Sequence, residues 1–504
     1  MSVQLRWIFS AWLAAGLLTA TTTLADDVPL VKRHWFEARS AHFNIYSCGE
    51  PARVFRVAGE LEQFCATYSQ LAGAQALASP PIVVIVFPDH ESMVPFLPLY
   101  QGQPENLAGF FVHGDDENLI VLSLPPAGTE HLDMSVVFHE YTHLLLRRND
   151  SIWPLWLKEG MAEIYSTFEM SGSSALIAQP IRYHLRLLTQ EPMMPLKELF
   201  SVTHDSPQYN ERARQGAFYA ESWLLTHLLF VGDDPRWRKR FANFTPLLRA
   251  GQTPEQAFTN AMGMSLAQTE VQLRNYLACG QFAPLQMPLP SAVVQMHSLA
   301  TRPLTPVENY FRLGDELMRI NRPDEAKTFF ADAQKLAPAS PLPYEGFGLL
   351  AIRRDQPDEA LQQFKESLKR GSASYLTHYY YALKKFRLMQ MAVEKNEPIT
   401  ADLKEIHDEL LKSLVLMGSF GGAHELFGIL EMAGDGDHSL AEQHLQLAVQ
   451  LEPENLYYQL ALAEAQFNNQ KPAAARQTLS TLLLPNVEAE LRSKAEALMR
   501  KIGN

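Results

Sequence analysis

Cysteine is scarce in this chain. Cys48, Cys65 and Cys279 are the three cysteines among 504 residues. Three are too few for a disulfide framework, and no two of them have the close spacing that is typical of a metal site. The sequence therefore excludes a cysteine-rich scaffold, and it leaves open one disulfide, for which Cys48 and Cys65 are candidates.

Long apolar runs and basic blocks are also lacking. After the first 25 residues, no apolar run reaches the roughly 20 residues that a membrane-spanning helix needs. The net charge is −13, and no block of Lys and Arg interrupts the acidic balance. We therefore expect no transmembrane segment in the mature chain and no nucleic-acid partner.

Residues 1–25 have the pattern of a secretory signal peptide. Arg6 precedes a mostly apolar stretch from Trp7 to Leu18, and Thr23-Leu24-Ala25 is an acceptable cleavage site. The alternative is an uncleaved N-terminal anchor. We expect the mature chain to be exported, to the periplasm or, alternatively, into the medium.

The stretch from Val136 to Leu146 contains His139-Glu140-Tyr141-Thr142-His143, a His-Glu-x-x-His motif without Gly or Pro. Its apolar neighbours predict a buried helix. Residues four apart share a face of a helix, so His139 and His143 can bind one Zn²⁺ together. Glu140 can act there as the general base on a water. The alternative is a pair of core or solvated histidines.

A second helix is predicted after Pro154. Glu159 and Glu163 fall one turn apart on it, within the run Trp156-Leu157-Lys158-Glu159-Gly160-Met161-Ala162-Glu163. A catalytic zinc has three protein ligands and one open position, and Glu159 can complete a His₂Glu set. Glu163 is placed to orient a ligand histidine without touching the metal. The alternative is a solvated helix face, which the neighbouring Trp156 and Met161 disfavour.

These two segments resemble the gluzincin metallopeptidases, above all the bacterial peptidase MA-like families. The resemblance covers about residues 34–280. It implies an α+β zincin-like fold with one Zn²⁺ per chain, Glu159 as the third ligand and Glu140 as the general base. The gap between His143 and Glu159 is shorter than in aminopeptidase-type gluzincins, so specificity for a free N-terminus is not implied.

Several shorter segments precede the motif. We expect a strand within 34–47, an amphipathic helix over 52–74 and a buried strand over 81–87. Two apolar runs flank a polar turn that we expect to be solvated, and together they predict a hairpin. The resemblance implies that a sheet edge before the motif pairs with the substrate, a role for which the candidates are Gly109, Phe110, Phe111 and Val112. The alternative is plain sheet structure.

Hydrolysis of a peptide also needs a donor aimed at the oxyanion. The resemblance implies a downstream Tyr or His for this role. Tyr219 is our candidate and His227 the second choice, within a helix predicted over 212–229. The alternative is that both are packing residues.

The C-terminal part repeats. After a Pro-rich linker at 281–306, residues at the 34-residue spacing of tetratricopeptide repeats include Tyr310, Leu313, Gly314, Ala326, Phe330, Ala333, Pro338, Tyr344, Phe347, Gly348, Ala360 and Phe364. Residues 374–420 are degenerate, and later units are marked by Ala441, Ala448, Pro453, Leu462, Ala463 and Ala475. We expect an all-α solenoid of helix pairs over 307–504, with a concave surface for a peptide or protein partner.

The sequence thus predicts a signal peptide (1–25), a zinc metallopeptidase domain (26–280), the linker and the tetratricopeptide domain. The predicted function is zinc-dependent hydrolysis of protein or peptide substrates, with the repeats recruiting a substrate or partner. The alternative is a periplasmic scaffold or chaperone-like assembly factor with a vestigial or rarely used peptidase site.

Overall fold

The computed structural model describes residues 30–72, 81–114, 116–129, 133–150, 152–210, 212–294, 298–395, 402–433, 436–484 and 487–503. The predicted signal peptide lies outside these ranges. The chain divides into two compact units. The first unit comprises residues 1–55, 78–132 and 298–504, and the second comprises 56–77 and 133–297. No helix of the described residues is long and apolar enough to cross a membrane.

A six-stranded mixed sheet forms the base of the first unit. Its strand order is β11-β1-β2-β3-β7-β6, in which β2, β3 and β7 run parallel and the outer pairings are antiparallel. The strands are β1 Phe36–Arg39, β2 Phe43–Ser47, β3 Ile82–Phe87, β6 Gly109–Val112, β7 Leu119–Ser123 and β11 Thr301–Pro303. A short helix, α2 His90–Met93, and a small hairpin, β4 Leu99–Tyr100 with β5 Gln103–Pro104, complete this part.

The predicted strand and hairpin segments are present, with one difference. The segment 34–47 forms two antiparallel strands, because the chain turns where the Ser40 amide donates to the Phe43 carbonyl. The strand β3 is buried along its whole length, as its β-branched run predicts. The predicted hairpin is β6 paired with β7.

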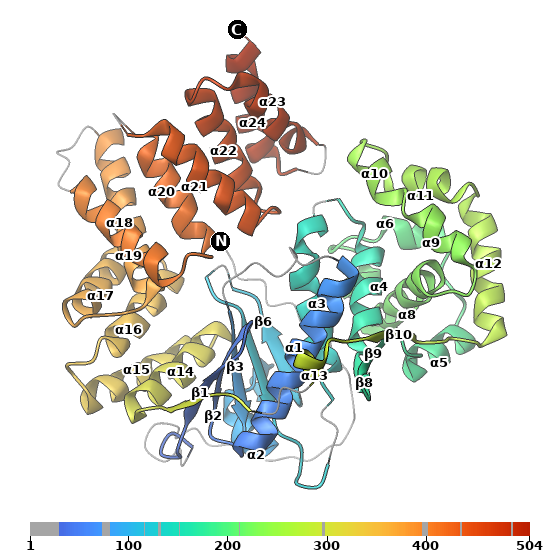
Figure 1. Ribbon diagram of the computed structural model, residues 1–504, viewed down its shortest axis with the longest axis horizontal. Coiled ribbons are helices and arrows are strands. Elements are labelled where there is room, and N and C mark those ends of the chain that lie inside the picture. Colours follow the sequence, from blue (N-terminus) through green and yellow to red (C-terminus); the bar gives the residue numbers. More distant parts are fainter. Residues whose placement is uncertain are drawn as a thin grey trace. The chain divides into compact units, whose positions relative to one another are not determined.

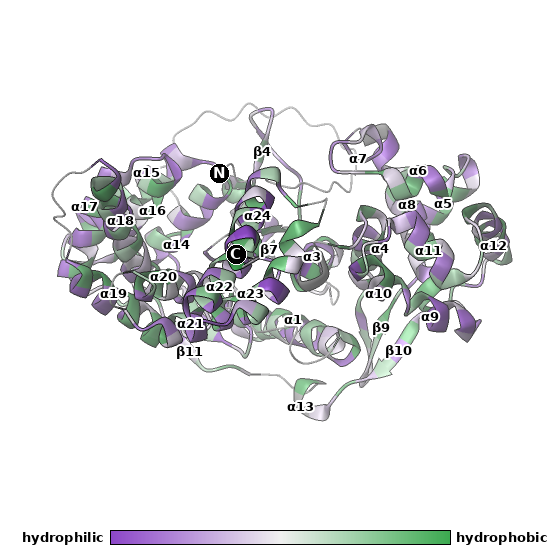
Figure 2. Ribbon diagram, turned by 90° about the horizontal axis from the view of Figure 1, so that it is seen from above, coloured by the Kyte–Doolittle hydropathy of each residue, from purple (hydrophilic) through white to green (hydrophobic). Residues whose placement is uncertain are grey.

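Helix pairs follow in the first unit (Figure 1). They are α14 Pro306–Arg319, α15 Pro323–Leu336, α16 Leu342–Arg353, α17 Pro357–Lys369, α18 Tyr375–Glu394, α19 Leu403–Leu416, α20 Gly421–Glu431, α21 His438–Leu451, α22 Leu456–Asn468, α23 Pro472–Leu479 and α24 Ala489–Gly503. The hydropathy colours alternate along these helices, as expected where one face packs on a neighbour (Figure 2). The degenerate region 374–420 keeps the pattern as α18 and α19.

Small residues let the repeat helices pack closely. A Cβ at Gly314 or Gly346 would lie within 3 Å of the Phe330 ring, and one at Gly348 would meet Phe364 in the same way. The glycines and phenylalanines of the repeat pattern are therefore each other's packing partners.

One apolar core joins the sheet to the first repeats. It includes Val83, Ile85 and Phe87 of β3 together with Phe311 and Phe330 of the first helix pair. Because a sheet face rich in β-branched residues must be covered, α14 and α15 supply the second layer. The sequence-based division, which placed the sheet with the zinc segments, did not anticipate this arrangement.

The predicted linker 281–306 is also more ordered than its composition suggests. It contains β10 Leu285–Pro288, which pairs with β9 Ser174–Ile177, and β11, which pairs with β1. Proline at the ends of these strands is tolerated because both lie at sheet edges.

The second unit is mainly helical. It comprises α1 Pro51–Ala72 from Arg56 onward, α3 Ser135–Asp150, α4 Leu155–Ser166, β8 Glu169–Ser171, β9 Ser174–Ile177, α5 Arg182–Gln190, α6 Leu196–Ser201, α7 Pro207–Asn210, α8 Arg212–Phe230, α9 Pro235–Phe241, α10 Phe244–Arg249, α11 Pro254–Met262, α12 Leu266–Cys279, β10 and α13 Ser291–Val294. The predicted helices over 52–74 and 212–229 correspond to α1 and α8.

Aromatic packing holds α3 and α4 in this unit. Phe64 of α1 stacks on Phe138 of α3 with ring centroids 4.5 Å apart. On the other side, the fully buried Trp156 of α4 stacks on Phe200 at 4.9 Å. Since both helices are packed against large rings, the side chains between them have little freedom.

Candidate metal centre

Helices α3 and α4 bring His139, His143 and Glu159 together. The two Nε2 atoms lie 3.2 Å apart. Glu159 Oε2 lies 3.2 Å from His143 Nε2 and 3.3 Å from His139 Nε2. These atoms form a nearly equilateral triangle of ligand-type groups, as the spacing in the sequence predicts.

This triangle fits a tetrahedral zinc ion. Zn²⁺ binds imidazole nitrogen and carboxylate oxygen at about 2.0–2.2 Å, which makes neighbouring ligand atoms of a tetrahedron about 3.3 Å apart. The three observed separations, 3.2, 3.2 and 3.3 Å, match that edge. The donor set, two neutral imidazoles and one carboxylate, is also one that catalytic zinc uses.

Helix α4 approaches α8 closely because of Gly160, which follows Glu159. A Cβ at this position would clash with the Thr226 side chain and the Ser222 carbonyl of α8. The absence of a side chain at Gly160 therefore fixes how near the ligand helix lies to α8.

Glu163 lies one turn after Glu159 and faces His139. Its Oε1 is 3.5 Å from His139 Nδ1, on the opposite side of the ring from Nε2. A carboxylate at Nδ1 keeps the proton there and leaves Nε2 to bind a metal. The structure thus places Glu163 beside His139, and its orienting role stays a prediction.

The charges of the site are predominantly negative. Burial alone would lower the pKa of His139, but Glu159 and Glu163 raise it to about 9. Burial likewise opposes ionisation of Glu159, yet His143 and His139 hold its pKa well below the usual range. Glu140 is buried too and adds a further carboxylate close to His139. Such a group of buried carboxylates and imidazoles attracts a divalent cation.

Tyr219 of α8 also reaches the site. Its ring lies 6.0 Å from the His139 ring, edge to face. Burial and the nearby Glu159 carboxylate raise the pKa of its hydroxyl, which therefore stays protonated and able to donate. Its role at an oxyanion stays a prediction.

His227, the second choice for the same role, is engaged elsewhere. Its Nδ1 lies 2.7 Å from the Tyr276 hydroxyl and its Nε2 lies 3.0 Å from the Ala178 carbonyl oxygen. Burial lowers its pKa to about 4. Both ring nitrogens are used in packing the unit, so the structure gives His227 no part in the metal centre.

Two residues of the site were missed by sequence reasoning. Tyr209 of α7 donates its hydroxyl to Glu159 Oε1 at 3.4 Å. His184 of α5 places Nε2 3.0 Å from Glu163 Oε2. Neither residue belongs to a recognisable sequence motif. The one signal for His184 is the apolar face of the 182–190 helix, which indicates that this side chain is buried.

The predicted substrate strand is β6. It lies at one edge of the six-stranded sheet, and among the described strands it pairs with β7 alone. An edge position is what strand addition requires, although all four residues of β6 are buried. The metal centre belongs to the other unit, so the role of this strand stays a prediction.

The polar turn between β6 and β7 differs from the expected solvated loop. Asp116 and Glu117 are largely buried, and the Arg319 guanidinium lies 2.9 Å from Asp116 Oδ1. Burial alone would raise the pKa of Asp116, but Arg319 lowers it. Asp115 lies outside the described residues.

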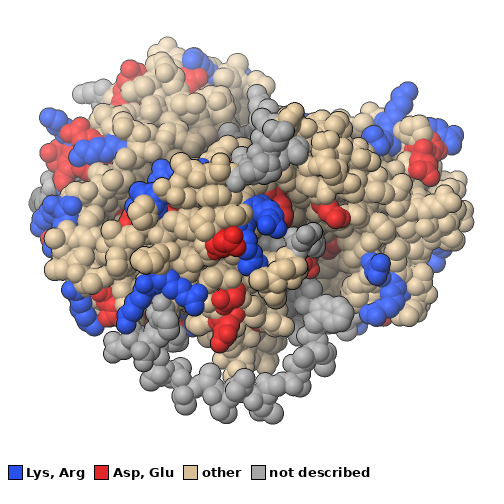
Figure 3. All heavy atoms as spheres, turned by 60° about the horizontal axis from the view of Figure 1, so that its bottom comes forward, with Lys and Arg blue, Asp and Glu red and all other residues tan. Residues whose placement is uncertain are grey.

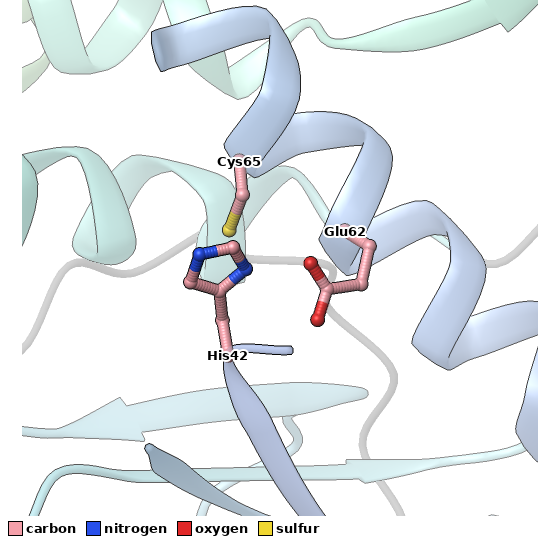
Figure 4. A group of neighbouring side chains, drawn as sticks. All are labelled: His42, Glu62 and Cys65. Atoms are coloured by element: carbon pink, nitrogen blue, oxygen red, sulfur yellow. The ribbon is translucent and has the colours of Figure 1, made fainter. Parts of the chain in front are cut away.

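The cysteines are the other ligand-type residues that the sequence singled out. The three cysteines are free, so the disulfide left open by the sequence is not formed. Figure 4 shows Glu62 and Cys65 on neighbouring turns of α1. Burial raises the pKa of Cys65, and its Sγ lies 3.1 Å from the Tyr141 hydroxyl.

Helix α9 carries a short run of Lys and Arg residues, which the net charge of the chain conceals. Arg236 pairs with Asp234, while Arg238 and Arg240 donate to the carbonyls of Phe230 and Met262. Most of its cations are therefore used within the unit. On the face drawn in Figure 3, Lys and Arg are interspersed with Asp and Glu. The expected absence of a nucleic-acid partner stays a prediction.

Comparisons with known proteins identify the repeats. Residues 307–340 and 432–502 match two family models, both described as tetratricopeptide repeat. The chain therefore contains tetratricopeptide repeats at both ends of its C-terminal part. No curated protein matches the chain.

Several solved structures are similar over part of the chain. YrrB, described as a TPR protein with an unusual peptide-binding site, is 17% identical, with 38% of this chain and 91% of that chain covered and a TM-score of 0.31. A thermophilic TPR protein of Thermus thermophilus is 20% identical, with 38% and 99% covered and a TM-score of 0.29. PilW, a type IV pilus biogenesis factor, is 16% identical, with 40% and 100% covered and a TM-score of 0.29.

Proposed function

We propose that this chain is an exported, zinc-dependent peptidase of the zincin-like α+β type, which acts on protein or peptide substrates. One observation carries the proposal: His139 Nε2, His143 Nε2 and Glu159 Oε2 lie 3.2–3.3 Å apart, as ligands of one tetrahedral ion do. The three ligands leave the fourth position open, which is typical of catalytic rather than structural zinc.

The residues around the ligands support hydrolysis. When bound, Zn²⁺ would polarise the scissile carbonyl and make water a nucleophile near neutral pH. Glu140 takes a proton from the attacking water and returns it to the leaving amine. Tyr219 donates its hydroxyl to the developing oxyanion. Each group is a type that the chemistry requires, and His139 and Tyr219 are within packing distance of each other.

The proposal is tested by incubating the full chain with an unfolded protein substrate. We expect cleavage that stops when zinc is removed by a chelator and returns when zinc is restored. Cleavage that is indifferent to the chelator would show that another site or a contaminating enzyme is responsible.

The tetratricopeptide matches favour a second function. Residues 307–340 and 432–502 match tetratricopeptide models, and such repeats form extended surfaces for peptides or proteins. A periplasmic scaffold or assembly factor, with the peptidase site rarely used, would need only this part. The two functions are separated by a variant that keeps the repeats and loses hydrolysis.

A further inference from the structure

Glu163 lies between two histidines from different helices. Its Oε1 is 3.5 Å from His139 Nδ1, and its Oε2 is 3.0 Å from His184 Nε2. The three side chains come from α3, α4 and α5, and none is more than 11% exposed. Because the Glu163 carboxylate is so little exposed, its orientation depends on the side chains around it, and these two rings are the closest partners that its oxygens have.

The closest polar contact of His184 is with Glu163. Both ring nitrogens of His184 are buried and neither makes a hydrogen bond of good geometry among the described residues, but Nε2 lies only 3.0 Å from Glu163 Oε2. The ring itself is fixed, since it packs against the Trp223 ring with centroids 6.2 Å apart. His184 thus holds a fixed position 3.0 Å from one oxygen of Glu163.

We propose that His184 is a positioning residue of the metal centre. Through its close polar contact with Glu163 Oε2, it restricts rotation about the last side-chain bond of Glu163, a torsion with broad preferences. Oε1 then stays directed at His139 Nδ1, and His139 Nε2 stays directed at the metal. The inference rests on the proposed function, because it assigns His184 a role toward the zinc site.

The experiment measures the zinc dissociation constant of the full chain by competition with a chelator. His184→Met fills the space with an apolar side chain that has no donor. His184→Gln places an amide N–H near the position of Nε2. We expect zinc binding to weaken about 10–100-fold in His184→Met, as for other partners of metal ligands, and to be largely restored in His184→Gln.

A double-mutant cycle separates positioning from packing. In a Glu163→Ala background, His184→Met should have no further effect on zinc affinity, because the carboxylate that it positions is gone. His424→Gln, which changes a buried histidine of the repeats, serves as a control with unchanged affinity. Circular dichroism of each variant verifies the fold.

The results distinguish the inference from the proposal beneath it. Equal zinc affinity in the native chain and His184→Met overturns the positioning role and leaves the metal centre standing. Equal losses in His184→Met and His184→Gln show that the ring acts only by packing, which also overturns it. A native chain that takes up no zinc removes the proposed function and this inference together.

Discussion

Arg319 of the first repeat and Asp116 of the β6–β7 turn form a buried ion pair, 2.9 Å long. The Arg319 side chain is 1% exposed and also lies 3.0 Å from Asp315 and 3.0 Å from the Glu117 carbonyl oxygen. The turn and the first repeat are therefore parts of one structural unit. A ligand that shifts α14 would act on the same turn that ends strand β6.

Arg319→Met should strongly destabilise the sheet and repeat unit. It leaves Asp116 and Asp315 buried without their cation, and breaking a buried pair in this way costs about 3–5 kcal/mol. Thermal unfolding of the full-length variant should show a transition at a lower temperature than in the native chain. Lys335→Met, which removes an exposed pair with Asp332, should change stability by no more than about 1 kcal/mol. Equal stability of the two variants would contradict the account.

Gly160→Ala should weaken zinc binding because it displaces the backbone of α4. The added Cβ would overlap Thr226 and the Ser222 carbonyl, so α4 must move away from α8 and carry Glu159 with it. Overpacking of this kind costs about 1–3 kcal/mol. We expect lower stability and weaker zinc binding, measured by thermal unfolding and chelator competition.

Gly418→Ala is the matched control for that change. The nearest atom to its Cβ would be the Leu414 carbonyl oxygen at 3.5 Å, an ordinary contact. It should leave zinc affinity as it is in the native chain. If Gly160→Ala behaved in the same way, the close approach of α4 and α8 would not be what sets the position of Glu159.

Glu140→Gln should keep zinc and lose hydrolysis. The amide has nearly the shape of the carboxylate but cannot accept the proton of the attacking water. General base catalysis contributes about 10²–10⁴-fold, and the cleavage rate should fall by that factor while zinc content is unchanged. Undiminished cleavage would remove Glu140 from the mechanism. The same variant should retain any partner bound by the repeats.

Tyr219→Phe should lower kcat more than it changes KM. The hydroxyl is assigned to the oxyanion, and loss of one oxyanion donor costs about 10²–10³-fold in kcat. Tyr209→Phe, which removes the hydroxyl that contacts Glu159 Oε1, should affect kcat less. If the order of the two variants is reversed, Tyr209 is the donor and the assignment of Tyr219 is wrong.

The convergence of His139, His143 and Glu159 was accessible from the sequence because it depends on local geometry. His139 and His143 lie four apart on one helix, and Glu159 and Glu163 repeat the spacing on the next. Once both helices form, the side chains can meet without further long-range information. The repeats were accessible for a similar reason, since each unit is a local helix pair.

The features that the sequence did not predict depend on contacts between segments that are far apart in the chain. Arg319 and Asp116 are 203 residues apart in the sequence. The residue types of a buried ion pair are the same as those of a solvated one, so the sequence does not distinguish them. For that reason the polar turn was expected to be solvated, and the union of the sheet with the repeats was not foreseen. His184 was missed because it reaches the site through Glu163, at a spacing that no motif records.

The zinc content of the purified full chain, measured beside His143→Ala, tests the central claim most directly. The account predicts about one zinc per native chain and little or none in the variant, because two of three ligands cannot hold the ion tightly. Absence of zinc from the native chain even after incubation with zinc would contradict it, since the triangle of His139, His143 and Glu159 would then not be a metal site.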